Sequence, residues 1–235
     1  MFRRQLLTTV AIAATVATTA EAETLTATPW AADSGTPVTP IDSTGWSFFT
    51  AGEAATIEAI VDRLIPADDL SIGGKEAGCA VFIDRQLAGA YGKGSVLYLK
   101  GPFAPGTPQQ GPQSGDTPAA HYKAGLADLA AYCAAQPGAK SFPELTPEAQ
   151  DLLLTDIESG TAALAHVDGK TFFKLLLKNT REGFLADPVY GGNKDMAGWK
   201  MLGFPGARYD YRDYIARRGE NLGLAPVAML GPIGS

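Results

Sequence analysis

The chain has 235 residues, a length typical of one domain with additional terminal segments rather than two full domains. Hydrophobic residues make up 46% of it and charged residues 19%, as in a globular protein that buries a core. The formal net charge of -6 disfavours a nucleic-acid partner, because such proteins usually carry a basic surface.

The first 22 residues have the three-part layout of a secretory signal. A short positive head containing Arg3 and Arg4 precedes a mildly apolar run over residues 6–19. Ala20 and Ala22 then supply the small residues that a signal peptidase reads, so we expect cleavage after Ala22.

Two export routes fit this signal. The paired arginines followed by Gln5 resemble a twin-arginine signal, which exports folded proteins, and we prefer this interpretation. Phe2 and Leu6 depart from that pattern, so a Sec signal and an uncleaved anchor stay as alternatives. The apolar run is short and rich in threonine, whereas a good transmembrane span needs about 20 apolar residues. Any membrane attachment should therefore come through a partner.

Residues 23–45 are rich in Thr, Ala, Pro and Ser without periodicity, which predicts an extended arm. A first helix should begin at Thr50, because Thr50 and Glu53 have the spacing of a capping box, and it should end at Pro66. Its apolar residues recur at helical spacing: Ala54, Ile57, Ile60, Val61, Leu64 and Ile65.

A second helix is expected over about residues 75–91, before a run of glycines. Residues 96–99 could form a short strand or an apolar staple. Residues 101–116 have Pro or Gly at half of their positions. A loop of this length in a compact domain is usually functional or disordered. The core face of the second helix should carry Cys79, Ile83, Leu87 and Tyr91.

Three further long helices have clear N-terminal signals. Thr117 and Thr146 each precede a proline, which favours a helix start, and Asp168 caps the last long helix. Residues 196–201 could add one turn. The predicted core positions are Tyr122, Leu126, Leu129 and Cys133, then Leu152, Leu153 and Ile157, then Phe172, Phe173, Leu176, Leu177, Thr180 and Phe184.

We find no alternating strand pattern and no internal repeat. The predicted fold is all-α: an irregular bundle of about five helices with long ordered loops and extended N- and C-terminal arms. The expected organisation is a signal over residues 1–22, an arm over 23–45, a helical domain over 46–218 and a C-terminal tail over 219–235.

Motifs for bound cofactors are missing from the sequence. It has no Gly-x-Gly-x-x-Gly between a strand and a helix, no Cys-x-x-Cys-His, and two histidines, His121 and His166, on separate segments. The Gly-Lys-Thr at residues 169–171 lacks the earlier glycine of a phosphate loop and indicates a helix N-terminus. Asp68 and Asp69 suit a solvated turn. We therefore assign no catalytic, cofactor-binding or metal residue.

The chain has two cysteines, Cys79 and Cys133, both on apolar helix faces. In an oxidising compartment an intrachain disulfide is one interpretation, worth roughly 4 kcal/mol in the chain-entropy model. Two buried free thiols, or a bond to another subunit, are the alternatives.

Residues 184–214 concentrate aromatic side chains among arginines, lysines and glycines. Such a composition suits the centre of a protein–protein interface. It equally suits an intramolecular loop anchored on the helices. The aromatic residues are Phe184, Tyr190, Trp199, Phe204, Tyr209, Tyr211 and Tyr214.

Several blocks resemble the gluconate 2-dehydrogenase subunit 3 family. They are residues 62–68, 101–103 and 109–113, and above all 182–196, which begins Glu-Gly-Phe-Leu-Ala-Asp-Pro-Val-Tyr-Gly-Gly-Asn, and 198–207. The resemblance extends over about residues 46–215.

The resemblance implies a non-catalytic small subunit of a periplasmic complex at the inner membrane. In such complexes a large flavoprotein carries FAD and oxidises gluconate or a related sugar acid, and a multihaem cytochrome c holds haem c. The small subunit would stabilise the flavoprotein and escort it through the twin-arginine pathway, with no cofactor of its own. The predicted partner interface is Phe103, Gln109, Gln110, Phe184, Tyr190, Trp199, Phe204, Arg208, Tyr209 and Tyr211.

Two other functions stay open. A stand-alone periplasmic enzyme could use residues 182–214, with Asp187, Asp195 and Arg208 as its polar groups. A scaffold of the complex could leave export to another component.

Overall fold

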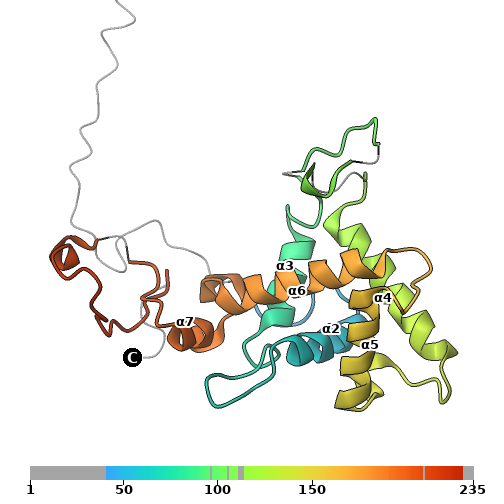
Figure 1. Cartoon of the computed structure of the whole chain (residues 1–235), viewed down its shortest axis with the longest axis horizontal. Coiled ribbons are helices and arrows are strands. Elements are labelled where there is room, and N and C mark those ends of the chain that lie inside the picture. Colours follow the sequence, from blue (N-terminus) through green and yellow to red (C-terminus); the bar gives the residue numbers. More distant parts are fainter. Residues whose placement is uncertain (1–40, 96, 105, 111–113, 209, 230–235) are drawn as a thin grey trace, which may run out of the picture. The chain divides into compact units, whose positions relative to one another are not determined.

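The computed structural model describes residues 41–95, 97–104, 106–110, 114–208 and 210–229. These residues contain six α-helices and no strand, which confirms the all-α class (Figure 1). The sixth helix is the short turn expected near residue 196. The helices are α2 (Ala51–Leu64), α3 (Cys79–Ala88), α4 (Pro118–Ala135), α5 (Pro147–Ser159), α6 (Gly169–Leu185) and α7 (Ala197–Leu202).

The described residues also contain five short 3-10 helices, four between the α-helices and one after α7. They are η1 (Pro108–Gln110), η2 (Phe142–Glu144), η3 (Pro188–Tyr190), η4 (Lys194–Met196) and η5 (Arg212–Tyr214). Residues 97–99 form neither a strand nor a helix. None of the helices that the structure describes is both long enough and apolar enough to span a bilayer.

The helix starts follow the capping signals in the sequence. The Thr50 hydroxyl accepts from the Glu53 amide at 3.3 Å, and the Glu53 carboxylate accepts from the Thr50 amide at 2.7 Å. Thr117, Thr146 and Asp168 cap α4, α5 and α6 in the same way. These four starts are confirmed within one residue.

Helix α3 begins at Cys79, later than expected. Residues 75–78 form a turn instead, and Gly78 takes a left-handed φ of 79° at its end. A Cβ at Gly78 would lie 2.7 Å from the Gly191 carbonyl oxygen, so this turn also packs closely on the C-terminal part of the chain.

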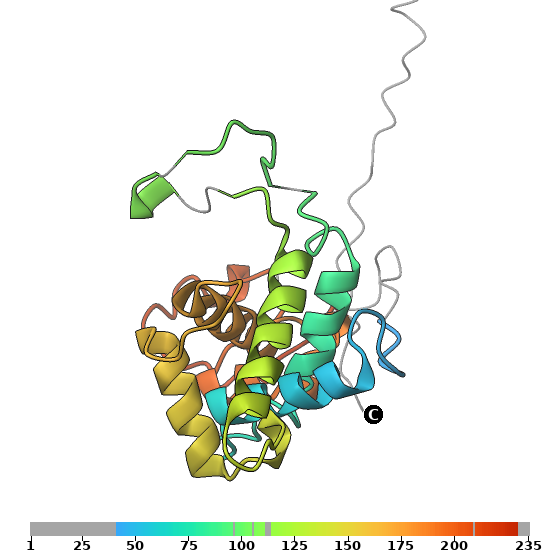
Figure 2. The same cartoon turned by 90° about the vertical axis from the view of Figure 1, so that its right-hand side faces the viewer.

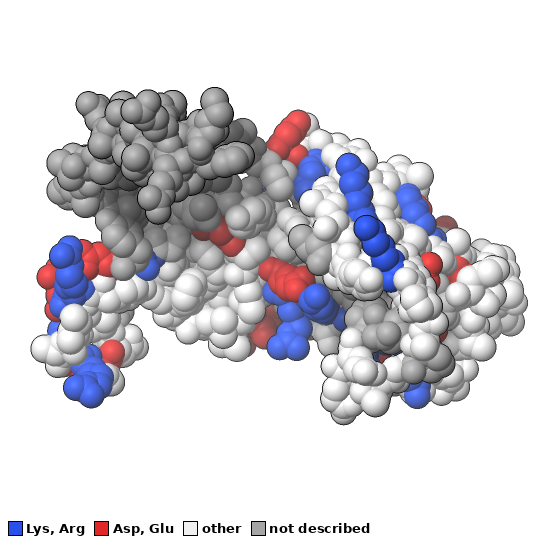
Figure 3. Space-filling view, turned by 90° about the horizontal axis from the view of Figure 1, so that it is seen from above, with Lys and Arg blue, Asp and Glu red and all other residues white. Residues whose placement is uncertain are grey.

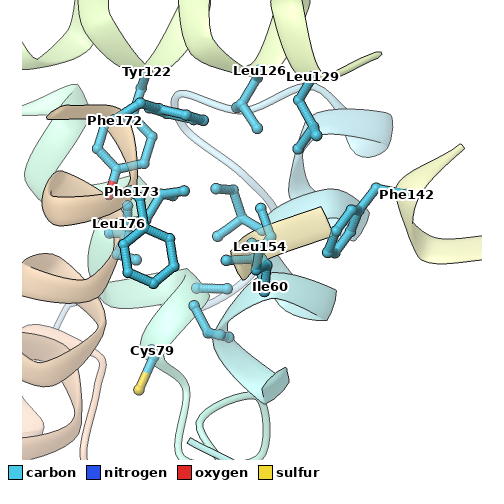
Figure 4. Close-up of a cluster of buried hydrophobic side chains, with 14 of the residues drawn as sticks. Ile60, Cys79, Tyr122, Leu126, Leu129, Phe142, Leu154, Phe172, Phe173 and Leu176 are labelled. Carbon is cyan, nitrogen blue, oxygen red and sulfur yellow. The ribbon is translucent and has the colours of Figure 1, made fainter. Parts of the chain in front are cut away.

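Helix α6 is the centre of the fold, because α2, α3, α4, α5 and α7 all contact it. Against α4 the approach is close at Gly125, where a Cβ would lie 2.4 Å from the Phe172 ring. Tyr122 meets the same ring edge to face, with centroids 6.1 Å apart. Figure 4 shows these rings beside the aliphatic side chains of α2, α4 and α5.

The predicted core is largely confirmed, with one error on α5. Leu152 is 63% exposed, whereas Leu154 is buried beside Leu153 and Ile157. Because three leucines follow one another, the sequence does not show which of them face the core. Packing against α6 buries the last two.

Both cysteines are free thiols in the buried core. Of the three alternatives, the structure therefore adopts buried free thiols, and neither sulfur has a surface from which to bond another subunit. Burial raises the pKa of Cys79 to about 12 and also raises that of Cys133. A protonated, enclosed thiol is a poor nucleophile, so these residues behave as small apolar groups.

The carboxylate of Asp84 holds residues 47–49 against α3. It is fully buried and accepts from the amides of Ser47, Phe48 and Phe49 at 2.8–2.9 Å. It also pairs with Arg85. Such an arrangement satisfies a buried charge with hydrogen bonds rather than leaving it unpaired.

The side chain of Arg85 extends this anchor toward the N-terminal arm. Its guanidinium donates to the carbonyl oxygens of Asp42, Thr44 and Gly45 at 2.9–3.1 Å. The Ile41 amide, one residue earlier, donates to the Val189 carbonyl at 3.2 Å. The last residues of the predicted arm are therefore bonded to the helical body.

Asp128 of α4 organises the loop before α6 in a similar manner. Its carboxylate accepts from the His166 and Val167 amides at 2.7 and 3.1 Å and lies 2.6 Å from His166 Nδ1. Burial acts to raise the pKa of this carboxyl, but the hydrogen bonds from His166 and Val167 outweigh it and lower the pKa.

We predict that Gly125→Ala destabilises the protein and that Gly52→Ala does not. At Gly125 the added methyl would collide with the buried Phe172 ring, at a cost of about 1–3 kcal/mol. At Gly52, on an open face of α2, the same change meets nothing within 4 Å and should stabilise by up to about 1 kcal/mol. Urea unfolding of both variants measures the difference; equal effects would contradict the close α4–α6 contact.

We further predict an acid-dependent effect of Asp128→Asn. Because the folded-state pKa lies below the ordinary 3.8, the carboxylate stabilises the fold above about pH 4. That contribution is lost as the pH falls through the folded pKa. The variant should therefore be less stable than wild type at pH 5, and the gap should narrow at pH 3. Chemical unfolding at both values tests this, with exposed Asp69→Asn as the control; a gap that widens at pH 3 would refute it.

Candidate functional site

The segment after α6 folds back onto the end of that helix. Trp199 donates its indole N–H to the Leu185 carbonyl at 2.7 Å, and Asn193 donates its amide N–H to the Ala186 carbonyl at 2.8 Å. The Asn193 side-chain oxygen also accepts from the Gly198 amide at 2.9 Å. The carbonyl groups that a helix leaves unbonded at its C-terminus thus gain side-chain partners.

Glycines make this contact possible. A Cβ at Gly192 would lie 2.2 Å from the Gly183 carbonyl oxygen, and one at Gly198 would lie 2.2 Å from the Phe184 carbonyl oxygen. No side chain fits at these distances, so the glycines bring two parts of the same chain together. In this first part of the aromatic region, the intramolecular interpretation is correct.

Two predicted interface residues are consequently interior. Phe184 is 2% exposed and belongs to the main core, and Trp199 is 6% exposed and packs with Met196 and Ala228. The expectation that their rings contact a partner is wrong, because they fill the inside of the domain.

Other predicted interface residues are exposed. Tyr190 is 43% exposed and Phe204 45%, although Phe204 also packs edge to face on Trp199 at 5.3 Å. Tyr211 is exposed as well and contacts Tyr214. Exposed rings that gather into a contiguous apolar patch can mark a contact with another protein, whereas rings scattered singly are common on protein surfaces.

The loop over residues 95–116 supplies the second group of exposed residues. Its described part extends away from the helices in both Figure 1 and Figure 2. Tyr98 is 82% exposed, and Phe103 and Gln109 are exposed too. Gln110 lies on η1, where its side chain accepts from the Thr107 amide at 2.6 Å.

Two of the three polar residues of the stand-alone enzyme hypothesis serve structural roles. Asp187 accepts from the Val189 amide at 3.0 Å and from the Met229 amide at 2.8 Å, which attaches the C-terminal tail. Arg208 donates to the Ala225 carbonyl at 2.9 Å. Asp195 is exposed. Within the described part of the chain, no group of three or more His, Cys, Asp or Glu could hold a metal ion.

Some predicted site residues lie outside the described residues. These are the export residues Arg3 and Arg4, the cleavage residues Ala20 and Ala22, and Tyr209.

An open groove of about 1040 Å³, not predicted from the sequence, lies between α3 and α6. Its floor is apolar, and three cations of α6 line it, namely Lys174, Lys178 and Arg181. Their spacing in the sequence was a usable signal, because residues three and four apart share one face of a helix. Figure 3 shows lysine and arginine side chains next to uncharged surface on one face of the molecule.

A polar network that extends from the buried Tyr122 to the exposed Glu182 supports one wall of this groove. Asn179 accepts from the Tyr91 and Tyr122 hydroxyls at 3.2 and 3.0 Å and donates to Glu182 at 2.8 Å. Complete burial, with the nearby Tyr91 and Glu182, raises the pKa of Tyr122 well above its ordinary value. Tyr122 is therefore a permanent hydrogen-bond donor in this network.

We predict that Asn193→Ala loosens the C-terminal block, by which we mean the segment after α6 that folds back onto the end of that helix. The change removes two buried hydrogen bonds and places alanine at a left-handed φ of 48°, for a combined loss of about 2–4 kcal/mol. Thermal unfolding should show the lower stability, and hydrogen exchange should be faster at Gly198. Asn221→Ala, at an exposed turn, is the control and should have little effect. Unchanged exchange at Gly198 would show that Asn193 does not hold the block.

Comparison with protein families then identifies the chain. The model for gluconate 2-dehydrogenase subunit 3 matches residues 51–206, which span α2 through α7 and the segment that packs on the end of α6. Comparisons with curated proteins and with solved structures give no match. The matched region covers well over half of the chain and includes four of the five resembling blocks in full, and the fifth, residues 198–207, except for its last residue. The chain belongs to the gluconate 2-dehydrogenase subunit 3 family.

Proposed function

We propose that this chain is the non-catalytic small subunit of a periplasmic, membrane-bound dehydrogenase complex. A large subunit of that complex would carry FAD and oxidise gluconate or a related sugar acid, and a multihaem cytochrome c would accept the electrons and provide the membrane attachment. Membership of the subunit 3 family carries this proposal. The family is by name one subunit of a dehydrogenase, so it implies a complex of several chains.

The exposed rings support a role in binding another protein. Tyr98 and Phe103 on the projecting loop, and Tyr190 and Phe204 near the end of α6, are large side chains that are between 43% and 82% exposed in the isolated chain. Aromatic residues are enriched at the centres of protein interfaces. Burying these rings against the large subunit would stabilise both chains.

The N-terminal signal supports a second role, the export of that partner. A twin-arginine signal carries folded proteins, so a flavoprotein without its own signal could cross the membrane only if it had already bound this chain. The bonds from Arg85 and Val189 to residues 41–45 connect the end of the arm to the folded body. We infer that the body forms and binds its partner before translocation.

We predict that removing residues 1–22 leaves the flavoprotein in the cytoplasm. The double change Arg3→Lys and Arg4→Lys should do the same if the twin-arginine route is used. The measurement is flavin-dependent dehydrogenase activity and flavoprotein antigen in periplasmic and cytoplasmic fractions.

The matched control changes Lys93→Arg and Lys100→Arg, two exposed residues of the mature chain. A flavoprotein that reaches the periplasm normally without residues 1–22 would refute the escort role. A flavoprotein that does not co-purify with the full chain would refute the subunit role itself.

A further inference from the structure

We propose that the groove between α3 and α6 binds an acidic, amphipathic helical segment of the flavoprotein large subunit. The inference rests on the proposed function and deepens it by assigning one contact with the large subunit to this groove. Four properties of the groove point to this occupant: its length, its apolar floor, its charge and its rigid wall.

The groove has the length of a short helix. It follows α6 from Lys174 to Ala186, which at 1.5 Å per residue is roughly 18 Å, or about three turns. On the opposite side it is bounded by Phe82, Gln86 and Tyr91 of α3 and the turn after it. A volume of about 1040 Å³ along such a line suits a segment of polypeptide laid between two helices.

The floor of the groove is apolar. Phe82, Leu177 and Leu185 line it, and the exposed ring of Tyr190 stands at the end nearest the C-terminal block. Leu97, at the base of the projecting loop, lines it as well and is partly exposed. An occupant must therefore present an apolar face at helical spacing.

The charge of the groove indicates which side chains the occupant carries beside its apolar face. Lys174, Lys178 and Arg181 line it, against the single acid Glu182. Glu182 is already engaged by Asn179 at 2.8 Å and Lys178 at 3.6 Å. Lys174 and Arg181 form no ion pair with any residue that the structure describes. This basic groove on a chain of net charge -6 complements carboxylates.

The wall beside Tyr91 is held in place before anything binds. Asn179 fixes the Tyr91 hydroxyl and the Glu182 carboxylate, and Tyr122 fixes Asn179 from inside the core. A groove that is ordered in advance loses less entropy on binding, which favours a specific partner.

The same features disfavour a membrane surface as the occupant. Proteins that lie on anionic lipid present an apolar helix face with basic residues along its borders, so that the face can enter the bilayer. Here the apolar residues form the floor of a groove between α3 and α6, where acyl chains and headgroups would have to leave the bilayer plane to reach them.

Photo-crosslinking of the complex tests whether the flavoprotein lies in the groove. A photoreactive amino acid at Gln86, which lines the groove, should crosslink the co-expressed flavoprotein, and mass spectrometry should place the bond in a segment with apolar residues at helical spacing and several Asp or Glu. The same group at Leu152, exposed on α5 and outside the groove, is the control and should give at least tenfold less product. Crosslinks to phospholipid, to a second copy, or to residues 23–40 of this chain would overturn the proposal.

Charge reversal tests whether the cations of the groove attract the occupant. The double change Lys174→Glu and Arg181→Glu should raise the Kd for the purified flavoprotein at least tenfold, and the salt dependence of binding should weaken. Lys140→Glu with Lys170→Glu reverses two exposed lysines outside the groove and should change the Kd by about twofold or less. Circular dichroism of both variants should match the wild type, because all four side chains are exposed.

The outcomes separate this inference from the proposed function. If the flavoprotein binds the wild type and both double variants with the same Kd, the groove is not the contact, and the subunit role stands. If the flavoprotein does not bind the wild-type chain, the inference about the groove and the proposed subunit function are both refuted.

Discussion

The carbonyl groups at the C-terminal end of α6 are bonded by side chains that lie 7 and 14 residues further along the chain. Asn193 and Trp199 can reach them because glycines on both sides allow backbone to meet backbone. The position of α7, of Tyr190 and of the tail that Asp187 holds follows from this one attachment. Since α6 also contacts the other long helices, an error at its end would displace both the core and the exposed surface.

The aromatic residues in the last turn of α6 and after it divide by function according to that attachment. Phe184 and Trp199 face inward and fix the backbone, whereas Tyr190 and Phe204 are left partly exposed by the same packing. The basic groove lies on the α3 side of the same helix, and Tyr190 borders it. One helix therefore supplies the centre of the core on its inner face and cations on its outer face, so the packing of the core also fixes the backbone that carries these cations.

Much of the fold was predictable from sequence because its signals are local. Capping residues such as Thr50 and Asp168 act on amides three residues away, and they set the helix starts correctly. What could not be predicted depends on contacts between distant segments. Whether Trp199 faces inward depends on Leu185, and nothing in the composition of residues 184–214 separates inner from outer rings. The groove needs α3 beside α6, a pairing that helical periodicity does not give.

The hydrogen bond from the Ile41 amide to the Val189 carbonyl links the beginning of the chain to its last quarter. A ribosome makes the donor early and the acceptor late, so the Ile41 amide lacks this partner while most of the domain is being translated, whereas Arg85, the partner of residues 42–45, is made much earlier. Chains released prematurely, before residue 189, would contain Ile41 yet lack the acceptor for this bond. This one bond therefore forms only after translation has passed the end of α6.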